Sequence, residues 1–119
     1  MSPLELAESA VQILDSKKAE NLKLIKISDI STLADYFVIA TGTGSTHVKA
    51  LADEVEFRLK EKDGTAPLHK EGYGSNSWIL LDYGSVVVHV FTEASRSYYN
   101  LDRLWRDGKM VDVSGLLKP

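Results

Sequence analysis

The stretch of the sequence that most resembles a chemical site is residues 42–47, Gly-Thr-Gly-Ser-Thr-His. It follows an apolar run and precedes a helical pattern, which is the setting in which a helix N-terminus holds a phosphate. Its spacing matches no phosphate-binding fingerprint, because a dinucleotide loop needs glycine at the position of His47 and a P-loop ends in Gly-Lys-Ser/Thr. We therefore expect a glycine turn with Thr43 or Ser45 as the helix N-cap, and keep an anion bound there as the alternative.

Acidic side chains at strand ends are the next candidates, since nucleotidyl transfer uses two carboxylates on one strand to hold a pair of cations. Asp82 ends an apolar run, but Leu80 precedes it by two residues and Gly84 follows it by two. The same face of that strand therefore offers no second carboxylate. Any nucleotidyltransferase-like core in this chain is expected to lack catalysis.

Histidine and cysteine offer no metal site. His47, His69 and His89 are scattered, no two of them stand at i, i+4 spacing, and the chain has no cysteine. His89 lies among valines, where we expect a hydrogen-bonded buried imidazole rather than a catalytic base. No Ser-His-Asp arrangement follows from the spacing. We expect no metal, no other cofactor and no enzyme activity.

Aromatic residues in the last third of the chain indicate binding rather than catalysis. Trp and Tyr are preferred at the centres of protein interfaces, and acids around them suit a basic partner. We assign Trp105 to the core and keep Trp78 and Tyr98 as contact candidates. The full set is Trp78, Tyr98, Tyr99 and Trp105, interleaved with Asp82, Glu93 and Asp102.

The composition is that of an ordinary globular chain, with 119 residues, 44% of them hydrophobic and 26% charged. A net charge of −3 suits a basic protein surface better than a phosphate backbone, so we expect little direct nucleic-acid binding. No apolar run approaches the roughly 20 residues that span a bilayer, and the N-terminus lacks a signal-peptide pattern. We expect a cytoplasmic protein without membrane contact, with one domain at residues 1–108 and a tail at residues 109–119.

Hydrophobic periodicity predicts the elements that position these residues. A capping box at residues 2–5 starts a helix that runs to about residue 17 or 18, with Leu4 opening its apolar stripe. Residues 22–27 alternate like a strand near a sheet edge, and residues 36–40 form a continuous apolar run typical of a central strand. A second amphipathic helix follows and ends before Gly64.

Two apolar runs around a short Asp-Tyr-Gly-Ser connection predict a β-hairpin. In its first strand, Trp78, Leu80 and Asp82 share one face, while Ile79 and Leu81 share the other. The second strand is apolar almost throughout, so we expect it to be covered on both faces. Whether the Trp78 face is core or contact surface is the question that the fold must answer.

A short strand around Leu68 and a helix from about residue 92 complete the order of elements. Helix, two strands, helix, three strands and helix together predict a mixed-sheet α/β or α+β domain with flanking helices. The tail receives no firm assignment. Val111 and Val113 alternate, so the tail is expected either to dock as an extended segment or to stay mobile.

Four segments in order carry a family resemblance. They are residues 35–42 (Asp-Tyr-Phe-Val-Ile-Ala-Thr-Gly), 44–53 (Gly-Ser-Thr-His-Val-Lys-Ala-Leu-Ala-Asp), the hairpin at 78–91, and 96–105 (Arg-Ser-Tyr-Tyr-Asn-Leu-Asp-Arg-Leu-Trp). Together they resemble the ribosomal silencing factor family, also called Iojap-like. The resemblance runs from Leu4 to Trp105 with family-like spacing.

The resemblance implies a nucleotidyltransferase-like α/β fold without catalysis. It implies binding to the large ribosomal subunit through large-subunit ribosomal protein fourteen, on the face that meets the small subunit. Bound there, such a factor blocks subunit joining and represses translation when nutrients run short; a role in large-subunit maturation is also attached to the family. On the matching motifs, the expected partner-binding residues are Trp78, Leu80, Asp82, Tyr98, Leu101 and Asp102.

Two rival classes of function stay open at this point. A nucleotidyltransferase-like enzyme would bind nucleotide in a metal-dependent way, and an RNA-binding module would bind naked RNA with a steep dependence on salt. The net negative charge of the chain argues against an RNA-binding module. A homodimer of the free protein through the same patch is a further expectation.

Overall fold

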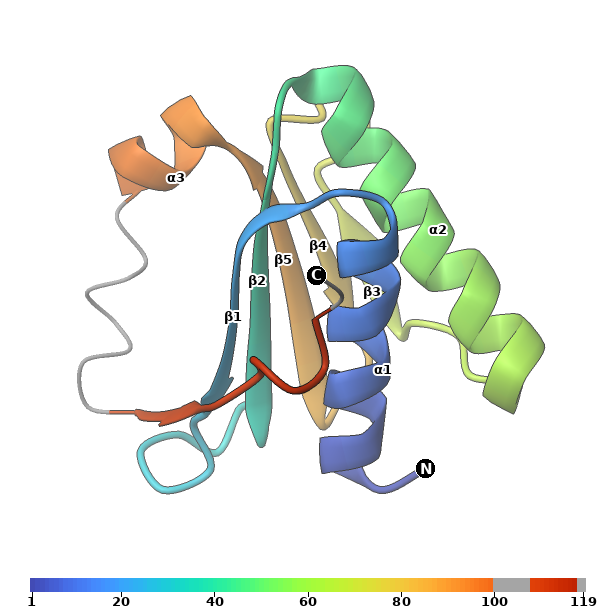
Figure 1. Ribbon diagram of the computed structural model, residues 1–119, viewed down its shortest axis with the longest axis vertical. Helices are drawn as coiled ribbons and strands as arrows, with labels where there is room; N and C mark the ends of the chain where they lie inside the picture. Colours follow the sequence, from blue (N-terminus) through green and yellow to red (C-terminus); the bar gives the residue numbers. More distant parts are fainter. Residues whose placement is uncertain (100–107, 118–119) are drawn as a thin grey trace.

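One mixed β-sheet organises the molecule, with helices on both sides of it (Figure 1). The computed structural model describes residues 1–99 and 108–117, and its strands there lie in the order β3-β4-β5-β2-β1-β6. The expected mixed-sheet class with flanking helices is confirmed. In chain order the elements are α1 (Pro3–Ser16), β1 (Glu20–Lys26), β2 (Tyr36–Gly42), α2 (Ser45–Asp63), β3 (His69–Glu71), β4 (Trp78–Asp82), β5 (Val86–Thr92), α3 (Glu93–Tyr99) and β6 (Lys109–Val111).

α1 begins at the predicted capping box. The Ser2 hydroxyl accepts from the backbone N–H of Glu5 at 3.1 Å, and the Glu5 carboxylate accepts from the backbone N–H of Ser2 at 3.2 Å. The helix ends just before Lys17, its C-cap. Leu4 lies at the edge of the apolar stripe and is 37% exposed, whereas Leu6 is buried. The predicted helix is confirmed, with its buried stripe rotated slightly from the predicted one.

α2 starts differently from the prediction. Its N-cap is Gly44, without a side-chain cap, and Ser45 is already the first helical residue, so the prediction of Thr43 or Ser45 as the N-cap is wrong. The imidazole of His47 binds the turn instead. Its Nδ1 accepts from the backbone N–H of Thr43 at 2.9 Å, and its Nε2 donates to the carbonyl oxygen of Lys17 at 2.9 Å. His47 thereby ties the start of α2 to the end of α1.

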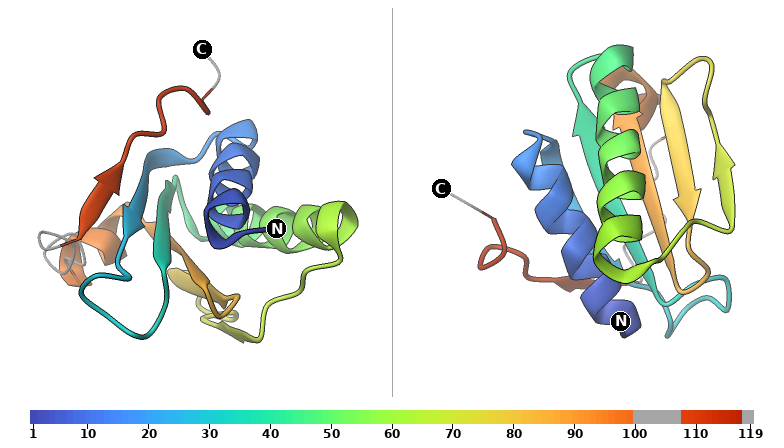
Figure 2. Two further views of the ribbon diagram at one scale, coloured as in Figure 1. Left: turned by 90° about the horizontal axis from the view of Figure 1, so that it is seen from below. Right: turned by 90° about the vertical axis from the view of Figure 1, so that its right-hand side faces the viewer.

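The two long helices, α1 and α2, pack on one face of the sheet, and α3 lies on the opposite face (Figure 2). Strand alternation supplies the side chains for each face. The α1/α2 face holds the larger core, to which the four inner strands contribute Leu24, Val38, Ala40, Ile79, Leu81, Val88 and Val90. We call the opposite side of the sheet the α3 face.

β2 and β5 run parallel in the middle of the sheet, and the remaining neighbours pair antiparallel. The predicted hairpin is confirmed as β4 and β5, with Trp78 opposite Phe91 and Leu80 opposite His89. β5 is buried from Val86 to Phe91, as predicted for a strand covered on both faces. The hairpin therefore joins the central parallel pair to the outer antiparallel part of the sheet.

Two short strands, β3 and β6, form the edges of the sheet. β3 begins one residue after Leu68, around which a strand is predicted, and β1 lies second from the edge because β6 pairs with it. Val111, Val113 and Leu116 pack against the core of the α1/α2 face. Of the two alternatives for the tail, docking is observed in its described part. Trp105, assigned to the core from the sequence, lies outside the described residues.

Candidate partner-binding surface

The α3 face carries a second, smaller apolar cluster that α1 and α2 do not cover. Three larger side chains, Phe37, Trp78 and Leu80, lie over it at half burial. Because two aromatic rings and one aliphatic side chain stay partly accessible, this face has the chemistry of a protein-binding surface. The buried members of the cluster are Ile25, Ile27, Ala34, Ile39, Val87 and Phe91.

The predicted two-sided character of β4 is confirmed. Ile79 and Leu81 are fully buried on the α1/α2 face, whereas Trp78, Leu80 and Asp82 alternate with them and are half-buried on the α3 face. The strand thus presents one aromatic, one aliphatic and one acidic side chain in a row. Their contact with a partner stays a prediction.

Trp78 and Asp82 lie at opposite ends of β4, about 13 Å apart along the strand. Trp78 is at the end where β5 passes into α3, and its indole N–H donates to Nδ1 of His89 at 3.3 Å. Asp82 lies at the hairpin turn, where its carboxylate accepts from the backbone N–H of Gly84 at 2.7 Å. One oxygen of Asp82 is therefore engaged in holding the turn, a structural role that the sequence prediction does not include.

The other three predicted contact residues follow β5 in the chain. Tyr98 belongs to the last turn of α3, on the same face of the sheet as Trp78, and its side chain is outside what the structure describes. Leu101 and Asp102 lie outside the described residues. The structure thus brings Trp78, Leu80 and α3 to one face, and the roles of all six residues stay predictions.

A buried arginine fixes α3 to the sheet. Arg96 is 7% exposed, and its guanidinium donates to the hydroxyl of Thr41 on β2 at 2.7 Å and to the carbonyl oxygen of Asn21 on β1 at 2.8 Å. Hydrogen bonds from a charged donor are stronger than those between neutral groups, and burial strengthens them further. Arg96 therefore sets the position of the helix that carries Tyr98.

Sequence reasoning misses three features of this surface. Phe37 stands in a continuous apolar run, which does not reveal the face that each residue takes. His89 is buried and hydrogen-bonded, as predicted, but its partner Trp78 is not foreseen. Glu71 lies opposite Leu80 in the β3–β4 register, so its exposed carboxylate stands beside the β4 row. The register of the predicted hairpin contains this information: counting residues outward from the turn on both strands places His89 close to Trp78.

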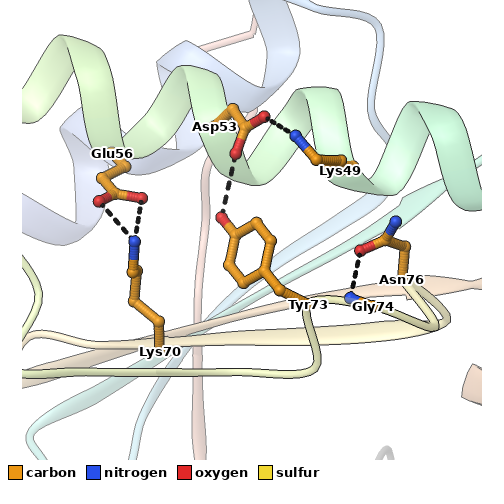
Figure 3. Close-up of polar contacts among 7 residues, drawn as sticks. All are labelled: Lys49, Asp53, Glu56, Lys70, Tyr73, Gly74 and Asn76. Atoms are coloured by element: carbon orange, nitrogen blue, oxygen red, sulfur yellow. Dashed lines mark hydrogen bonds and ion pairs between the residues drawn. The ribbon is translucent and has the colours of Figure 1, made fainter.

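The turn that leads into β4 is anchored to α2, as Figure 3 shows. The Tyr73 hydroxyl donates to the carboxylate of Asp53 at 3.2 Å, and Lys49 pairs with the same carboxylate at 2.7 Å. Lys70 on β3 pairs with Glu56 at 3.1 Å. Burial, together with the nearby Asp53 carboxylate, raises the pKa of Tyr73, so its phenol stays a hydrogen-bond donor. These links hold the start of β4 in place.

The described part of the chain assembles no metal site: residues 1–99 and 108–117 contain no group of three His, Cys, Asp or Glu side chains able to share a cation. Over the same residues, no helix combines the length and apolar character needed to traverse a bilayer.

A groove of about 550 Å³ lies on the other side of the molecule, between α1 and α2. Phe57 lines it and is 60% exposed, which makes this residue a useful reference point far from the α3 face.

Comparison with known proteins assigns the chain to a family. A family model described as "Ribosomal silencing factor during starvation" matches residues 1–119. The chain belongs to this family. The resemblance seen in the four sequence segments is thereby confirmed. The family is regulatory and non-catalytic, and this chain is accordingly not an enzyme.

Relatives from bacteria and from a mammal share most of the chain. The ribosomal silencing factor RsfS of Halalkalibacterium halodurans is 39% identical over 117 residues, which are 98% of this chain and 99% of that protein. The crystal structure of a protein from Chromobacterium violaceum has a TM-score of 0.84 at 36% identity, covering 88% of this chain and 87% of that one. The Mus musculus protein named mitochondrial assembly of ribosomal large subunit protein 1 is 31% identical over 97 residues, which are 80% of this chain and 42% of that protein.

Proposed function

We propose that this chain represses translation by binding the large ribosomal subunit and blocking its association with the small subunit, notably under nutrient limitation. Membership of the ribosomal silencing factor family supports an interaction with the ribosome. The proposed partner is large-subunit ribosomal protein fourteen on the intersubunit face. A folded domain bound there stands in the way of the small subunit, so repression needs no catalysis.

The observation that carries the proposed contact is the half-buried row on β4. Trp78 and Leu80 supply apolar anchors, and Asp82 and Glu71 supply acids around them. Apolar anchors at the centre and acids at the rim complement a basic protein surface, and the net charge of −3 favours the same encounter. The proposed contact residues are Trp78, Leu80, Asp82, Tyr98, Leu101 and Asp102.

Co-sedimentation with isolated large subunits tests this proposal. Trp78→Ala should weaken binding about tenfold or more, as expected for an aromatic hot spot. Phe57→Ala is the matched control, because it likewise removes an aromatic side chain that solvent can reach, but Phe57 lies on α2, on the other side of the sheet. A light-scattering assay of subunit joining should show that wild-type protein and Phe57→Ala prevent joining while Trp78→Ala does not.

Each outcome has a defined meaning. Wild-type protein that fails to bind large subunits would contradict the proposed function itself. A folded Trp78→Ala variant that binds like wild type would show that the surface is assigned wrongly. The rival classes predict other signals, namely a metal-dependent thermal shift with nucleotides for an enzyme, and salt-sensitive binding of naked RNA for an RNA-binding module.

A second role in large-subunit maturation is favoured by the name of the mouse relative, which refers to assembly of the mitochondrial large subunit. Cells that lack the gene for this chain should then accumulate incomplete large subunits on sucrose gradients. We further propose a cytoplasmic location, little direct nucleic-acid binding and a homodimer of the free protein through the α3 face. A dimer that uses this face would dissociate when large subunits are added.

A further inference from the structure

The indole of Trp78 is held in two ways by side chains of β5. Trp78 and His89 are diagonal neighbours across the hairpin, because Trp78 pairs with Phe91 and His89 pairs with Leu80. The indole N–H donates to Nδ1 of His89 at 3.3 Å, and the indole ring stacks on Phe91 with 5.0 Å between ring centroids and 28° between planes. Phe91 thus sets the plane of the ring, and His89 sets the direction in which the N–H points.

The acceptor on His89 is available at neutral pH. His89 is 5% exposed and has aromatic neighbours on the α3 face, including Phe37, whose ring centroid lies 4.8 Å away in a T-shaped arrangement. Burial lowers the pKa of His89 to about 4, although the Asp82 carboxylate acts in the other direction. The imidazole is therefore neutral under physiological conditions, with its lone pair on Nδ1 facing the indole.

The same hydrogen bond leaves the other ring nitrogen without a partner. Because Nδ1 accepts, the neutral imidazole carries its hydrogen on Nε2, and Nε2 of His89 is buried with no hydrogen-bond partner among residues 1–99 and 108–117. A buried donor without an acceptor is destabilising. A phenylalanine at position 89 would fill similar space without that unpaired donor, so the histidine is unfavourable for stability alone. What it supplies in return is the acceptor for Trp78.

We propose that His89 is a positioning residue that presents Trp78 to the partner protein. This inference rests on the proposed function, because it deepens the role of the Trp78 surface. His89 itself stays beneath that surface. It acts by fixing the orientation in which the indole meets the partner, so the entropy of ordering the ring is lost on folding and not on binding.

Three substitutions at one position separate the two ring nitrogens. His89→Asn places an amide oxygen near the position of Nδ1 and can still accept from the indole. His89→Gln extends its amide toward the position of Nε2 and leaves no acceptor near Nδ1, and His89→Phe removes both polar atoms. We expect His89→Phe and His89→Gln to bind isolated large subunits about 3- to 10-fold more weakly, the effect of one hydrogen bond, and His89→Asn to stay close to wild type.

Two further readouts distinguish positioning from loss of structure. His89→Phe should melt at or above the wild-type temperature, because it removes an unpaired buried donor. The indole N–H resonance of Trp78 in a ¹⁵N correlation spectrum, assigned by its absence in Trp78→Phe, should move in His89→Phe and stay near its wild-type position in His89→Asn. In a Trp78→Phe background, which has no indole donor, His89→Phe should cause no further loss of binding.

The possible results distinguish a failure of the positioning role of His89 from a failure of the proposed function. If Trp78→Ala weakens binding but His89→Phe binds like wild type, the positioning role is wrong and the surface stands. If Trp78→Ala also binds like wild type, the surface is wrong and the positioning role falls with it. If His89→Gln binds normally and His89→Asn does not, the imidazole acts through Nε2, which also overturns the inference. Should His89→Phe fail to fold, the comparison of His89→Asn with His89→Gln decides the question.

Discussion

Gly72 lies directly against the carbonyl group of Trp78, so closely that a Cβ at Gly72 would overlap the carbonyl oxygen. The glycine also adopts φ of +93°, a conformation that residues with a side chain rarely take. The turn that precedes β4 can therefore close only around a glycine at this position. The backbone at the first residue of the candidate surface depends on a neighbour that has no side chain.

Gly72→Ala should lower the free energy of unfolding by more than about 2 kcal/mol, because steric overlap adds to the strain of a left-handed backbone. Gly74→Ala is the matched control: Gly74 has φ of +121°, but apart from its chain neighbours no atom of the described residues lies within 4 Å of the place that a Cβ would take there. The control should show the backbone strain alone, at about 1–2 kcal/mol. Urea denaturation of the two variants measures the difference, and equal losses would rule out the overlap as the larger effect.

Neighbouring leucines on β4 should separate stability from binding. Leu81 is fully buried on the α1/α2 face, so Leu81→Ala should cost about 2–5 kcal/mol of stability through the cavity it leaves. Leu80→Ala should cost about 1 kcal/mol, because Leu80 is half-buried, yet it should weaken binding to large subunits. Thermal unfolding and co-sedimentation of both variants test this pair. A Leu80→Ala variant with wild-type binding would exclude Leu80 from the contact.

Stability should depend on pH through His89. Its pKa is lowered from 6.5 to about 4 in the folded protein, so above about pH 6.5 the imidazole is neutral in both states and its contribution is fully present. Between about pH 4 and pH 6.5 the imidazole of His89 binds a proton in the unfolded chain but not in the folded protein. Stability should therefore fall as the pH falls, by up to about 3 kcal/mol from this group. In His89→Phe the slope of unfolding free energy against pH should be smaller over this window, and an unchanged slope would contradict the assignment.

Arg96 should be needed to keep α3 in place. Arg96→Met removes the two hydrogen bonds to Thr41 and Asn21 and should cost about 2–3 kcal/mol, since bonds from charged donors are stronger than neutral ones. Thr41→Val removes one acceptor only and should cost less. Hydrogen exchange of the amides at residues 96–99, which lie beyond the first turn of α3, should speed up in the arginine variant. Unchanged exchange there would show that other contacts hold the helix.

Features that depend only on residues close together in the sequence were predictable. The capping box of Ser2 and Glu5 is a pattern of neighbouring residues, and the alternation of Ile79 and Leu81 with their neighbours is a property of one strand. The fold class followed from the order of such elements. These predictions succeed because the physics that decides them acts over a few residues.

Features that depend on distant parts of the chain were not predictable in the same way. His47 forms a hydrogen bond with Lys17, which is thirty residues earlier in the chain, and no sequence pattern near residue 47 predicts that contact. β6 is three residues long, and its pairing with β1 is decided by a partner far back in the chain. The Trp78–His89 bond depends on the strand register, which the hairpin turn fixes but which composition does not show. The candidate site was therefore only partly visible from sequence.

The pairing of β6 with β1 has a consequence for the synthesis of the protein. β1 belongs to the first hairpin-like pair made by the ribosome, whereas β6 is the last described strand to emerge. Until residues 109–111 leave the exit tunnel, the outer edge of β1 is an open row of backbone donors and acceptors, the kind of template that recruits strands from other chains. A newly made chain in which residues 109–111 have not yet paired with β1 would therefore tend to associate with other chains along one side of its sheet.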